Sequence, residues 1–220
     1  MTDRVALVFG ATGLVGSEVV KLLVADASYS EVHVLVRREL GWGDEKLHVH
    51  LTDFRDLSSL QLPSNVTDVF CCLGTTQKKA GSKEAFYAID FQLTFDLIRM
   101  AREAGAEQLL MISSIGAAAN SSSYYLKVKG ELEEAVRSLS FSSTSILRPS
   151  VLLGERPEHR FAESLAGAVL PRLSILLIGA LRKYRPIEGK AVARALVAYA
   201  DEQRPGFRVL ESHEIAAKAV

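Results

Sequence analysis

The chain has 220 residues, and its 26 Lys and Arg residues balance 26 Asp and Glu residues, so its formal net charge at pH 7 is zero. A folded chain of this length buries about 70% of the surface that its unfolded form exposes, so it needs neither disulfides nor a structural metal for stability. The charge balance argues against a nucleic-acid-binding protein, because such proteins usually carry a basic excess. A surface without net charge does little to oppose self-association, so the composition is compatible with a homodimer.

Cysteine content and apolar patterning indicate the compartment. The two cysteines, Cys71 and Cys72, are neighbours and rarely bridge each other, so we expect no disulfide and a reducing, cytoplasmic location. Residues 1–4 lead directly into an apolar strand, without the features of a secretory leader. The longest apolar stretch, residues 165–181, is interrupted by a proline and an arginine, so we expect no membrane span.

Short apolar runs alternate with segments whose apolar residues recur at helical spacing. The runs are typical of strands that are buried on both faces of a parallel sheet. This alternation predicts an α/β protein with a Rossmann-type doubly wound parallel sheet and helices on both faces, in which ligands bind at the carboxyl ends of the strands. The predicted strands are residues 5–9, 32–36, 47–51, 68–73, 109–112 and 145–147, and the predicted helices are residues 14–24, 83–102 and 123–139.

The rhythm changes after residue 150. No linker rich in Pro, Gly or Ser separates this region, so we expect a single NAD(P)-binding domain over residues 1–220, with residues 150–190 forming a small substrate-side lobe. The apolar run 173–181 fits a pocket wall, a subunit contact or a membrane surface, and a pocket or a dimer contact is favoured. The predicted elements here are a helical, irregular segment over residues 158–181, a helix over 189–202, a strand over 207–210 and a helix over 214–219.

Three glycines lie where the first strand meets the first helix. Gly10 permits a tight turn, Gly13 lets a pyrophosphate approach the backbone, and Gly16 lets the helix pack closely on the sheet. The helix N-terminus then offers free N–H groups to phosphates. The alternative is a glycine-rich turn that serves geometry alone. We assign to the cofactor the residues of this loop, Gly10, Thr12, Gly13, Leu14, Val15 and Gly16.

Two arginines follow the second strand. At this position an acidic residue would accept hydrogen bonds from the ribose hydroxyl of NAD, but the chain has Arg37 and Arg38. A guanidinium binds a 2′-phosphate through paired hydrogen bonds, so the sequence favours NADP, with Arg37 as the first choice. The alternative is that both are solvated charges at a strand end.

A serine, a tyrosine and a lysine form the candidate catalytic group. Ser114 closes the fifth strand, and Tyr125 and Lys129 lie four residues apart, on one face of the next helix. An ammonium favours the phenolate, so Lys129 would allow Tyr125 to act as general acid or base, while Ser114 hydrogen-bonds a substrate carbonyl. The alternative is a surface tyrosine near a solvated lysine.

These residues carry a family resemblance over nearly the whole chain. The sequence resembles the short-chain dehydrogenase/reductase superfamily, in its extended or atypical branch. Within that branch it is most similar to the small oxidoreductase-like proteins related to the human Tat-interacting protein, which share segments like residues 71–76 and 184–187. The resemblance implies catalytic roles for Ser114, Tyr125 and Lys129, the lysine also holding the cofactor ribose.

The resemblance also implies further cofactor contacts. Asp53 takes the place of the acidic residue that contacts adenine, with Phe54 beside it. Gly74 and Thr75 would pass close to the cofactor, and residues 148–150 would border its nicotinamide end. One position departs from the family, since many members have an asparagine on the fourth helix where this chain has Asp90.

Two histidines share one face of a predicted strand. His48 and His50 point the same way from a strand, but no third ligand stands at a recognised spacing, so we expect no metal site.

The first functional hypothesis is an NADPH-dependent oxidoreductase. Hydride passes between the nicotinamide and a small-molecule carbonyl or alcohol substrate, with Tyr125 as general acid or base. The alternative is a regulatory protein that senses NADP(H) with little or no turnover. A third hypothesis is a scaffold that the nucleotide merely stabilises.

Overall fold

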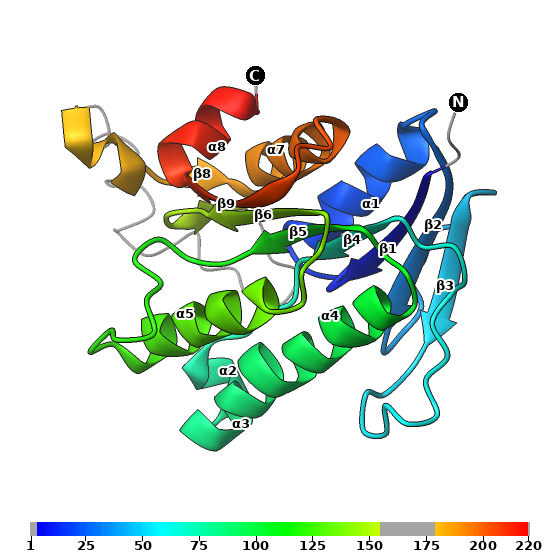
Figure 1. Cartoon of the computed structure of the whole chain (residues 1–220), viewed down its shortest axis with the longest axis horizontal. Coiled ribbons are helices and arrows are strands. Elements are labelled where there is room, and N and C mark those ends of the chain that lie inside the picture. Colours follow the sequence, from blue (N-terminus) through cyan, green and yellow to red (C-terminus); the bar gives the residue numbers. More distant parts are fainter. Residues whose placement is uncertain (1–3, 155–178, 220) are drawn as a thin grey trace.

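The computed structural model describes residues 4–154 and 179–219. Seven strands form one parallel sheet in the order β3-β2-β1-β4-β5-β6-β9 (Figure 1). This arrangement confirms the predicted Rossmann-type α/β fold. The strands are β1 (Arg4–Phe9), β2 (Tyr29–Val36), β3 (Leu47–Leu51), β4 (Asp68–Cys71), β5 (Gln108–Ile112), β6 (Ser143–Arg148) and β9 (Gly206–Glu211).

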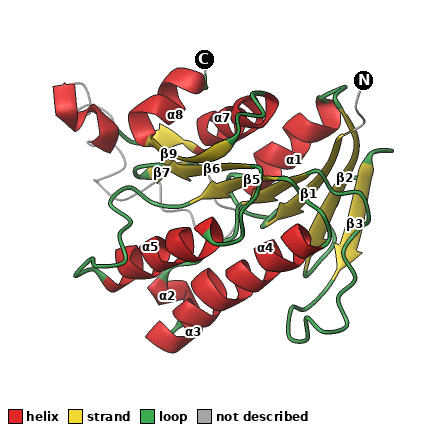
Figure 2. Cartoon of the chain, viewed as in Figure 1, coloured by secondary structure: helices red, strands yellow, loops and turns green. Residues whose placement is uncertain are grey.

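Helices cover both faces of the sheet (Figure 2). One hydrophobic cluster lies under α1, α7 and α8, and a second lies under α4 and α5. In β1, Ala6 and Val8 belong to the first cluster and Leu7 and Phe9 to the second, because successive side chains of a strand point to opposite faces. The helices are α1 (Gly16–Ala25), α4 (Thr94–Glu103), α5 (Tyr124–Arg137), α7 (Gly189–Asp201) and α8 (Ser212–Lys218).

The helix predicted over residues 83–102 is divided. α3 (Lys83–Tyr87) is joined to α4 by a π-helical turn over Ala88–Leu93. The Thr94 hydroxyl donates to the carbonyl of Ile89, 2.8 Å away and five residues earlier, which stabilises the wider turn. Such turns are frequent at functional sites.

Three short elements were not predicted, because they are too short for a periodic pattern to reveal. They are α2 (Gln77–Ala80) and the two strands of a small parallel sheet, β7 (Leu152–Leu153) and β8 (Ile187–Glu188).

The predicted helical segment 158–181 lies mostly outside the described residues, as does most of the apolar run 173–181. Gly179–Tyr184 forms a 3₁₀ helix, and α7, β9 and α8 follow close to their predicted positions. Among the helices that the structure describes, none combines the length and the apolar character needed to cross a membrane.

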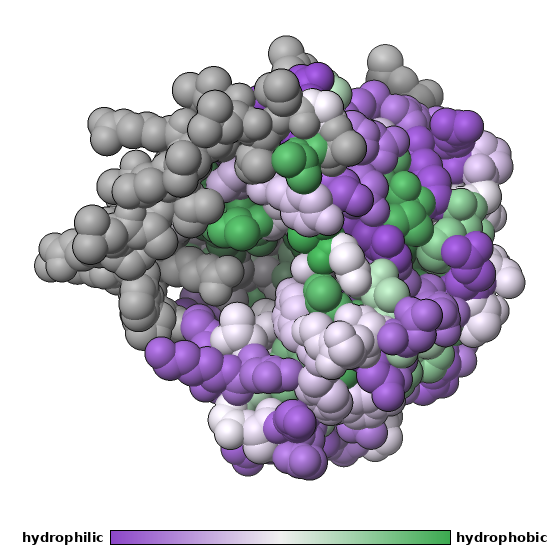
Figure 3. Space-filling view, turned by 90° about the vertical axis from the view of Figure 1, so that its left-hand side faces the viewer, coloured by the Kyte–Doolittle hydropathy of each residue, from purple (hydrophilic) through white to green (hydrophobic). Residues whose placement is uncertain are grey.

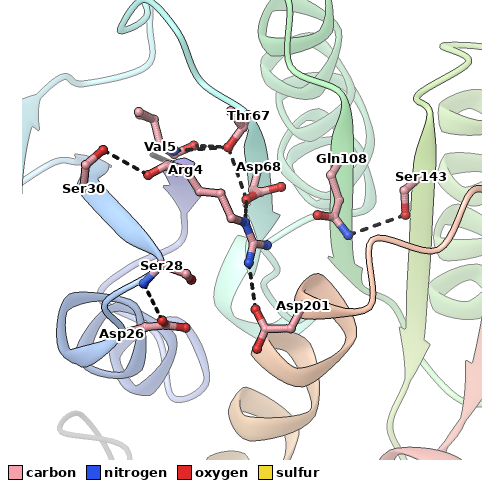
Figure 4. Close-up of polar contacts among 10 residues, drawn as sticks. All are labelled: Arg4, Val5, Asp26, Ser28, Ser30, Thr67, Asp68, Gln108, Ser143 and Asp201. Atoms are coloured by element: carbon pink, nitrogen blue, oxygen red, sulfur yellow. Dashed lines mark hydrogen bonds and ion pairs between the residues drawn. The ribbon is translucent and has the colours of Figure 1, made fainter. Parts of the chain in front are cut away.

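A buried arginine forms ion pairs at the amino ends of the strands (Figure 4). Arg4 Nε lies 2.7 Å from an Asp68 carboxylate oxygen, and Arg4 Nη1 lies 2.7 Å from an Asp201 oxygen. The guanidinium also stacks over the Tyr29 ring, 4.3 Å from its centroid. This cluster ties β1, β4 and α7 together at the amino edge.

The order of the strands reverses between β1 and β4. Sheets of this kind bind ligands outside the carboxyl ends of the strands at such a switch point. Figure 3 looks onto the side of the molecule toward which β1 and β5 point, where hydrophobic residues lie among polar ones. The carboxyl edge at β1 and β4 is therefore where the predicted site residues must be sought.

Candidate active site

The glycine loop connects β1 to α1 at this edge. Gly10 has φ +79°, and a Cβ there would lie 2.6 Å from the backbone of Cys72, so a side chain would collide with the segment after β4. A Cβ on Gly16 would lie 2.2 Å from the Gly10 carbonyl oxygen, so this glycine lets α1 pack directly on the turn. Thr12 and Gly13 are exposed, which leaves their backbone open to a ligand.

The side chains of Leu14 and Val15 turn inward from the loop. Val15 is buried in the first hydrophobic cluster. Leu14 fills the space beside two other glycines, since a Cβ on Gly154 or Gly189 would lie 2.6 or 2.8 Å from its side chain. Both residues can therefore offer only backbone groups to a cofactor, and Leu14 anchors the loop against the start of α7.

The predicted ribose and adenine contacts lie at the ends of β2 and β3. Arg37 and Arg38 are exposed directly after β2, and Asp53 is exposed after β3. Phe54, with φ +60°, packs against the second hydrophobic cluster. Because β1, β2 and β3 are parallel, these residues share one edge with the glycine loop.

Tyr125 and Lys129 lie one turn apart on α5. Tyr125 is partly buried, and its ring packs on Phe86 of α3 with the centroids 5.6 Å apart. Lys129 is almost fully buried, and its Nζ lies 2.7 Å from an oxygen of Asp90, which is also buried. The carboxylate that replaces the expected asparagine is thus the counter-ion of the lysine.

The charge state of Lys129 follows from its neighbours. Burial alone would lower the pKa of this ammonium, but the charge of Asp90 and the proximity of Tyr125 outweigh it and raise the pKa above its ordinary value. Lys129 is therefore a stable cation at neutral pH, within electrostatic reach of the Tyr125 phenol.

The loop after β4 wraps around this ion pair. A Cβ on Gly74 would lie 3.3 Å from Lys129 Nζ, so a side chain at this position would crowd the ammonium. The Thr75 backbone N–H donates to the other oxygen of Asp90, at 2.9 Å. The structure therefore brings Gly74 and Thr75 together with Lys129 and Asp90, and Asp90 accepts contacts from two separate segments.

Ser114 lies in the loop that follows β5. This loop can rest on α5 because Gly130 of the helix has no side chain. A Cβ at Gly130 would lie 2.2 Å from the Ala118 carbonyl carbon. The Ala118 N–H also donates to the carbonyl of Leu126, at 3.2 Å. Gly130 thus holds the segment that bears Ser114 against the helix that bears Tyr125 and Lys129.

One buried carboxylate near this site was not predicted. Glu133 accepts a hydrogen bond from the Ser113 hydroxyl and pairs with Arg148, whose Nε lies 3.0 Å away. Its spacing was a usable signal, because Tyr125, Lys129 and Glu133 follow at intervals of four residues and share one helix face. Glu133 thus holds the side chains of Ser113, which precedes Ser114, and of Arg148 at the end of β6.

The cysteines take no part in this chemistry. Cys71 is buried at the end of β4, and burial raises the pKa of its thiol to about 11. Cys71 and Cys72 are both free, as expected.

A protein-family model matches most of the chain. The model of the "NAD dependent epimerase/dehydratase family" matches residues 6–207. Relatives are similar over nearly their full length. "Protein FMP52, mitochondrial" of Eremothecium gossypii is 35% identical over 213 residues, which cover 96% of this chain and 95% of the relative. "Protein FMP52-1, mitochondrial" of Scheffersomyces stipitis is 34% identical over 222 residues, covering 96% of each.

Solved structures share the fold at low sequence identity. MoeE5, in complex with UDP-glucose and NAD, has a TM-score of 0.68 at 19% identity, covering 97% of this chain and 80% of that one. DesIV, a dTDP-glucose 4,6-dehydratase from Streptomyces venezuelae with NAD and TYD bound, has a TM-score of 0.68 at 18% identity, covering 98% and 80%.

The relatives correct one expectation and confirm another. The cytoplasmic location expected from the sequence is wrong, because the similar fungal proteins are named mitochondrial. Unbridged cysteines indicate a reducing compartment without distinguishing one such compartment from another. The expected family is confirmed: with the family model matching residues 6–207, the chain belongs to the NAD-dependent epimerase/dehydratase family of the extended short-chain dehydrogenase/reductase superfamily.

Proposed function

We propose that this protein is an NADP(H)-dependent oxidoreductase that interconverts a carbonyl and an alcohol on a small molecule. The observation that carries the proposal is the buried ammonium of Lys129 one helical turn from Tyr125, at the carboxyl edge of the sheet. A phenol beside a fixed cation in a dinucleotide-binding fold is suited to proton transfer at a reacting oxygen.

The edge fits a phosphorylated dinucleotide. Thr12 and Gly13 present exposed backbone beside the N-terminus of α1, where N–H groups and the helix dipole favour phosphate. Arg37 is exposed directly after the neighbouring strand, and its guanidinium is suited to pairing with a 2′-phosphate. Asp53 and Phe54 are proposed at the adenine end, and Gly74 and Thr75 along the cofactor.

The chain's own residues then divide the work. NADPH, when bound, supplies a hydride to the carbonyl carbon. Tyr125 donates its phenolic proton to the carbonyl oxygen, and Ser114 donates a hydrogen bond to the same oxygen to orient it. Lys129 stabilises the resulting phenolate. In the reverse direction Tyr125 removes the alcohol proton.

The substrate is proposed to enter from the side of residues 150–190. Val151 and Leu181 are exposed hydrophobic residues in the described parts of this region, and they offer apolar surface to a substrate. In this reading the whole chain is one domain with a small substrate-side lobe.

One observation favours a second candidate, a protein that senses NADP(H) with little turnover. The Asp90 carboxylate lies 2.7 Å from Lys129 Nζ and compensates its charge, which weakens the field that the ammonium exerts on Tyr125. With the ammonium compensated in this way, the cofactor would still bind but proton transfer at Tyr125 would be slower.

Steady-state turnover of a panel of aldehydes and ketones with NADPH separates the two. We expect Tyr125→Phe to lower kcat/KM by about 10²- to 10⁴-fold, as the removal of a general acid does. The matched control is Tyr124→Phe, since the neighbouring phenol donates only to the Lys83 carbonyl and should leave turnover nearly unchanged.

A Tyr125→Phe variant as active as the parent would refute the enzyme proposal. NADPH binding without turnover of any substrate by the parent would favour the sensor.

A further inference from the structure

Three histidines and a glutamate gather at the outer edge of the sheet, on strands β2 and β3. His33 of β2 stands in register with His48 of β3. Glu31 precedes His33 by two residues and His50 follows His48 by two, so all four side chains lie on the same face. The spacing around His48 and His50 shows no third ligand, because the other groups come from a different strand.

The side chains of this cluster are in direct contact. His33 Nε2 lies 2.8 Å from Glu31 Oε2, and His48 Nε2 lies 4.0 Å from the same oxygen. The rings of His33 and His48 stack with their centroids 4.7 Å apart. One ligand atom from each of these three residues lies within 4.8 Å of the others.

These separations are close to those of a zinc site. Zinc bonds of about 2.0–2.2 Å in a tetrahedron place neighbouring ligand atoms about 3.4 Å apart. The observed separations of 2.8 and 4.0 Å from Glu31 Oε2 lie on either side of that value. Binding requires rotations of these side chains that bring the three ligand atoms to similar separations.

The burial of the ligands suits such a site. The His33 side chain is only 8% exposed and is fixed within the sheet, whereas those of Glu31 and His48 are 49% and 45% exposed. His33 is thus held in place while the side chains of Glu31 and His48 can adjust. The solvent-exposed side of the cluster lets an ion enter and lets water complete its coordination.

His50 supplies the outer support that metal-bound histidines usually have. Its Nε2 lies 2.9 Å from His33 Nδ1. When Nδ1 of His33 carries the ring proton, its N–H donates a hydrogen bond to Nε2 of His50. Nε2 of His33 then presents a lone pair toward the Glu31 carboxylate. Two acceptors 2.8 Å apart repel each other unless a proton or a metal cation lies between them, and a metal ion can take the place of the proton that His33 Nε2 would otherwise share with Glu31. A hydrogen bond from the second ring nitrogen fixes a histidine for metal binding.

We propose that Glu31, His33 and His48 bind a divalent transition metal ion of the zinc class, with His50 orienting His33. The imidazole and carboxylate ligands favour zinc over magnesium, which prefers oxygen ligands in an octahedron. The ion would join edge strand β3 to β2. The proposed ligands are not among the residues of the candidate active site. His33 precedes Arg37 by four residues, or about 13 Å along an extended strand, while the supporting His50 precedes Asp53 by three.

Zinc titration of the tag-free, EDTA-treated full chain tests this proposal, with isothermal calorimetry and melting temperature as readouts. We expect one zinc ion per chain, a higher melting temperature with ZnCl2, and no comparable response to MgCl2. Both His48→Ala and Glu31→Gln should weaken zinc binding by about tenfold or more. His213→Ala is the matched control, since His213 is an exposed histidine on α8 outside the cluster.

Cobalt provides an independent readout on the unmodified chain. We expect CoCl2 to give the strong visible absorption of a four-coordinate ion, and ZnCl2 to displace it. Absence of zinc binding by the parent, or equal affinity in the parent, His48→Ala and Glu31→Gln, would overturn the proposal, as would the weak spectrum of a six-coordinate cobalt ion.

Discussion

The two edges of the sheet each hold a buried ion pair, but they are built differently. At the amino edge, Arg4 contacts Asp68 and Asp201 (Figure 4). Its guanidinium also stacks on the Tyr29 ring. At the carboxyl edge, Lys129 pairs with Asp90. The loop after β4 covers this pair, and its residue nearest to the ammonium is Gly74.

The difference indicates that the amino edge of the sheet serves stability and the carboxyl edge serves ligand binding. Arg4, Asp68 and Tyr29 are all buried, and the Tyr29 ring covers one face of the guanidinium. Beside Lys129, Gly74 has no side chain where the loop after β4 approaches the ammonium, and in the glycine loop at the same edge Thr12 and Gly13 remain exposed. We therefore expect substitutions at the amino edge to reduce the free energy of unfolding, and substitutions at the carboxyl edge to act mainly on ligand binding.

The largest expected effect on stability comes from Arg4→Ala. Burial raises the pKa of the Asp68 carboxyl and Arg4 opposes that rise, so removing Arg4 leaves a buried carboxylate without its counter-ion. Breaking a buried pair in this way costs about 3–5 kcal/mol. Urea denaturation would measure this loss in the free energy of unfolding.

Arg204→Ala is the matched control for Arg4→Ala, because Arg204 is an exposed arginine just before β9. Its free energy of unfolding should stay within about 0.5 kcal/mol of the parent. Equal losses in the two variants would show that the amino-edge cluster contributes no special stability.

A smaller effect is expected from Gly130→Ala. The added methyl group would lie 2.2 Å from the Ala118 carbonyl carbon, so the loop that bears Ser114 must move away from α5. Overpacking of this kind costs about 1–3 kcal/mol. Turnover, where measurable, should fall together with stability, because the proposed substrate-orienting hydroxyl shifts.

Gly43→Ala is the control for Gly130→Ala, since nothing lies within 4 Å of a Cβ at Gly43. Thermal melting of both variants would decide the matter. A Gly130→Ala protein as stable and as active as Gly43→Ala would mean that the loop does not depend on this contact.

The smallest expected effect concerns pH. Hydrogen bonds from Lys218 and Arg208 lower the pKa of Glu202, which follows α7 near the amino edge. A lowered pKa in the folded state gives stability that is present above the ordinary glutamate value of about 4.5 and is lost as pH falls through the folded value. Partly exposed pairs contribute about 0–1 kcal/mol each.

Urea denaturation between pH 6 and pH 3 would test this pH effect with Glu202→Gln. The parent should lose more stability over that range than the variant, which is already weaker at pH 6. If the free energy of unfolding fell equally with pH in the parent and in Glu202→Gln, the ion pairs of Glu202 would not contribute to stability at the amino edge.

Much of the architecture could be predicted because it depends on local patterns. Alternating apolar runs indicated the parallel sheet, the glycines at positions 10, 13 and 16 indicated the turn, and the four-residue interval placed Tyr125 and Lys129 on one face. Glu133 continues that interval and could have been found in the same way.

The rest depends on contacts between distant segments. The sequence marked Asp90 as a departure from the family, but only the π-helical turn and the loop after β4 bring its carboxylate to Lys129. In the same way, His33 reaches His48 through strand pairing, which no spacing within one segment reveals. The side-chain direction of Leu14 likewise required the fold.

The most direct test of the carboxyl edge is a comparison of NADPH and NADH by thermal shift, using the parent, Arg37→Ala and the amino-edge control Arg204→Ala. Bound ligand stabilises by RT ln(1 + [L]/Kd), so the shift reports affinity. We predict a larger shift with NADPH than with NADH for the parent and Arg204→Ala, and a loss of that difference in Arg37→Ala. Equal shifts for the two nucleotides in the parent, or an undiminished NADPH preference in Arg37→Ala, would contradict the account.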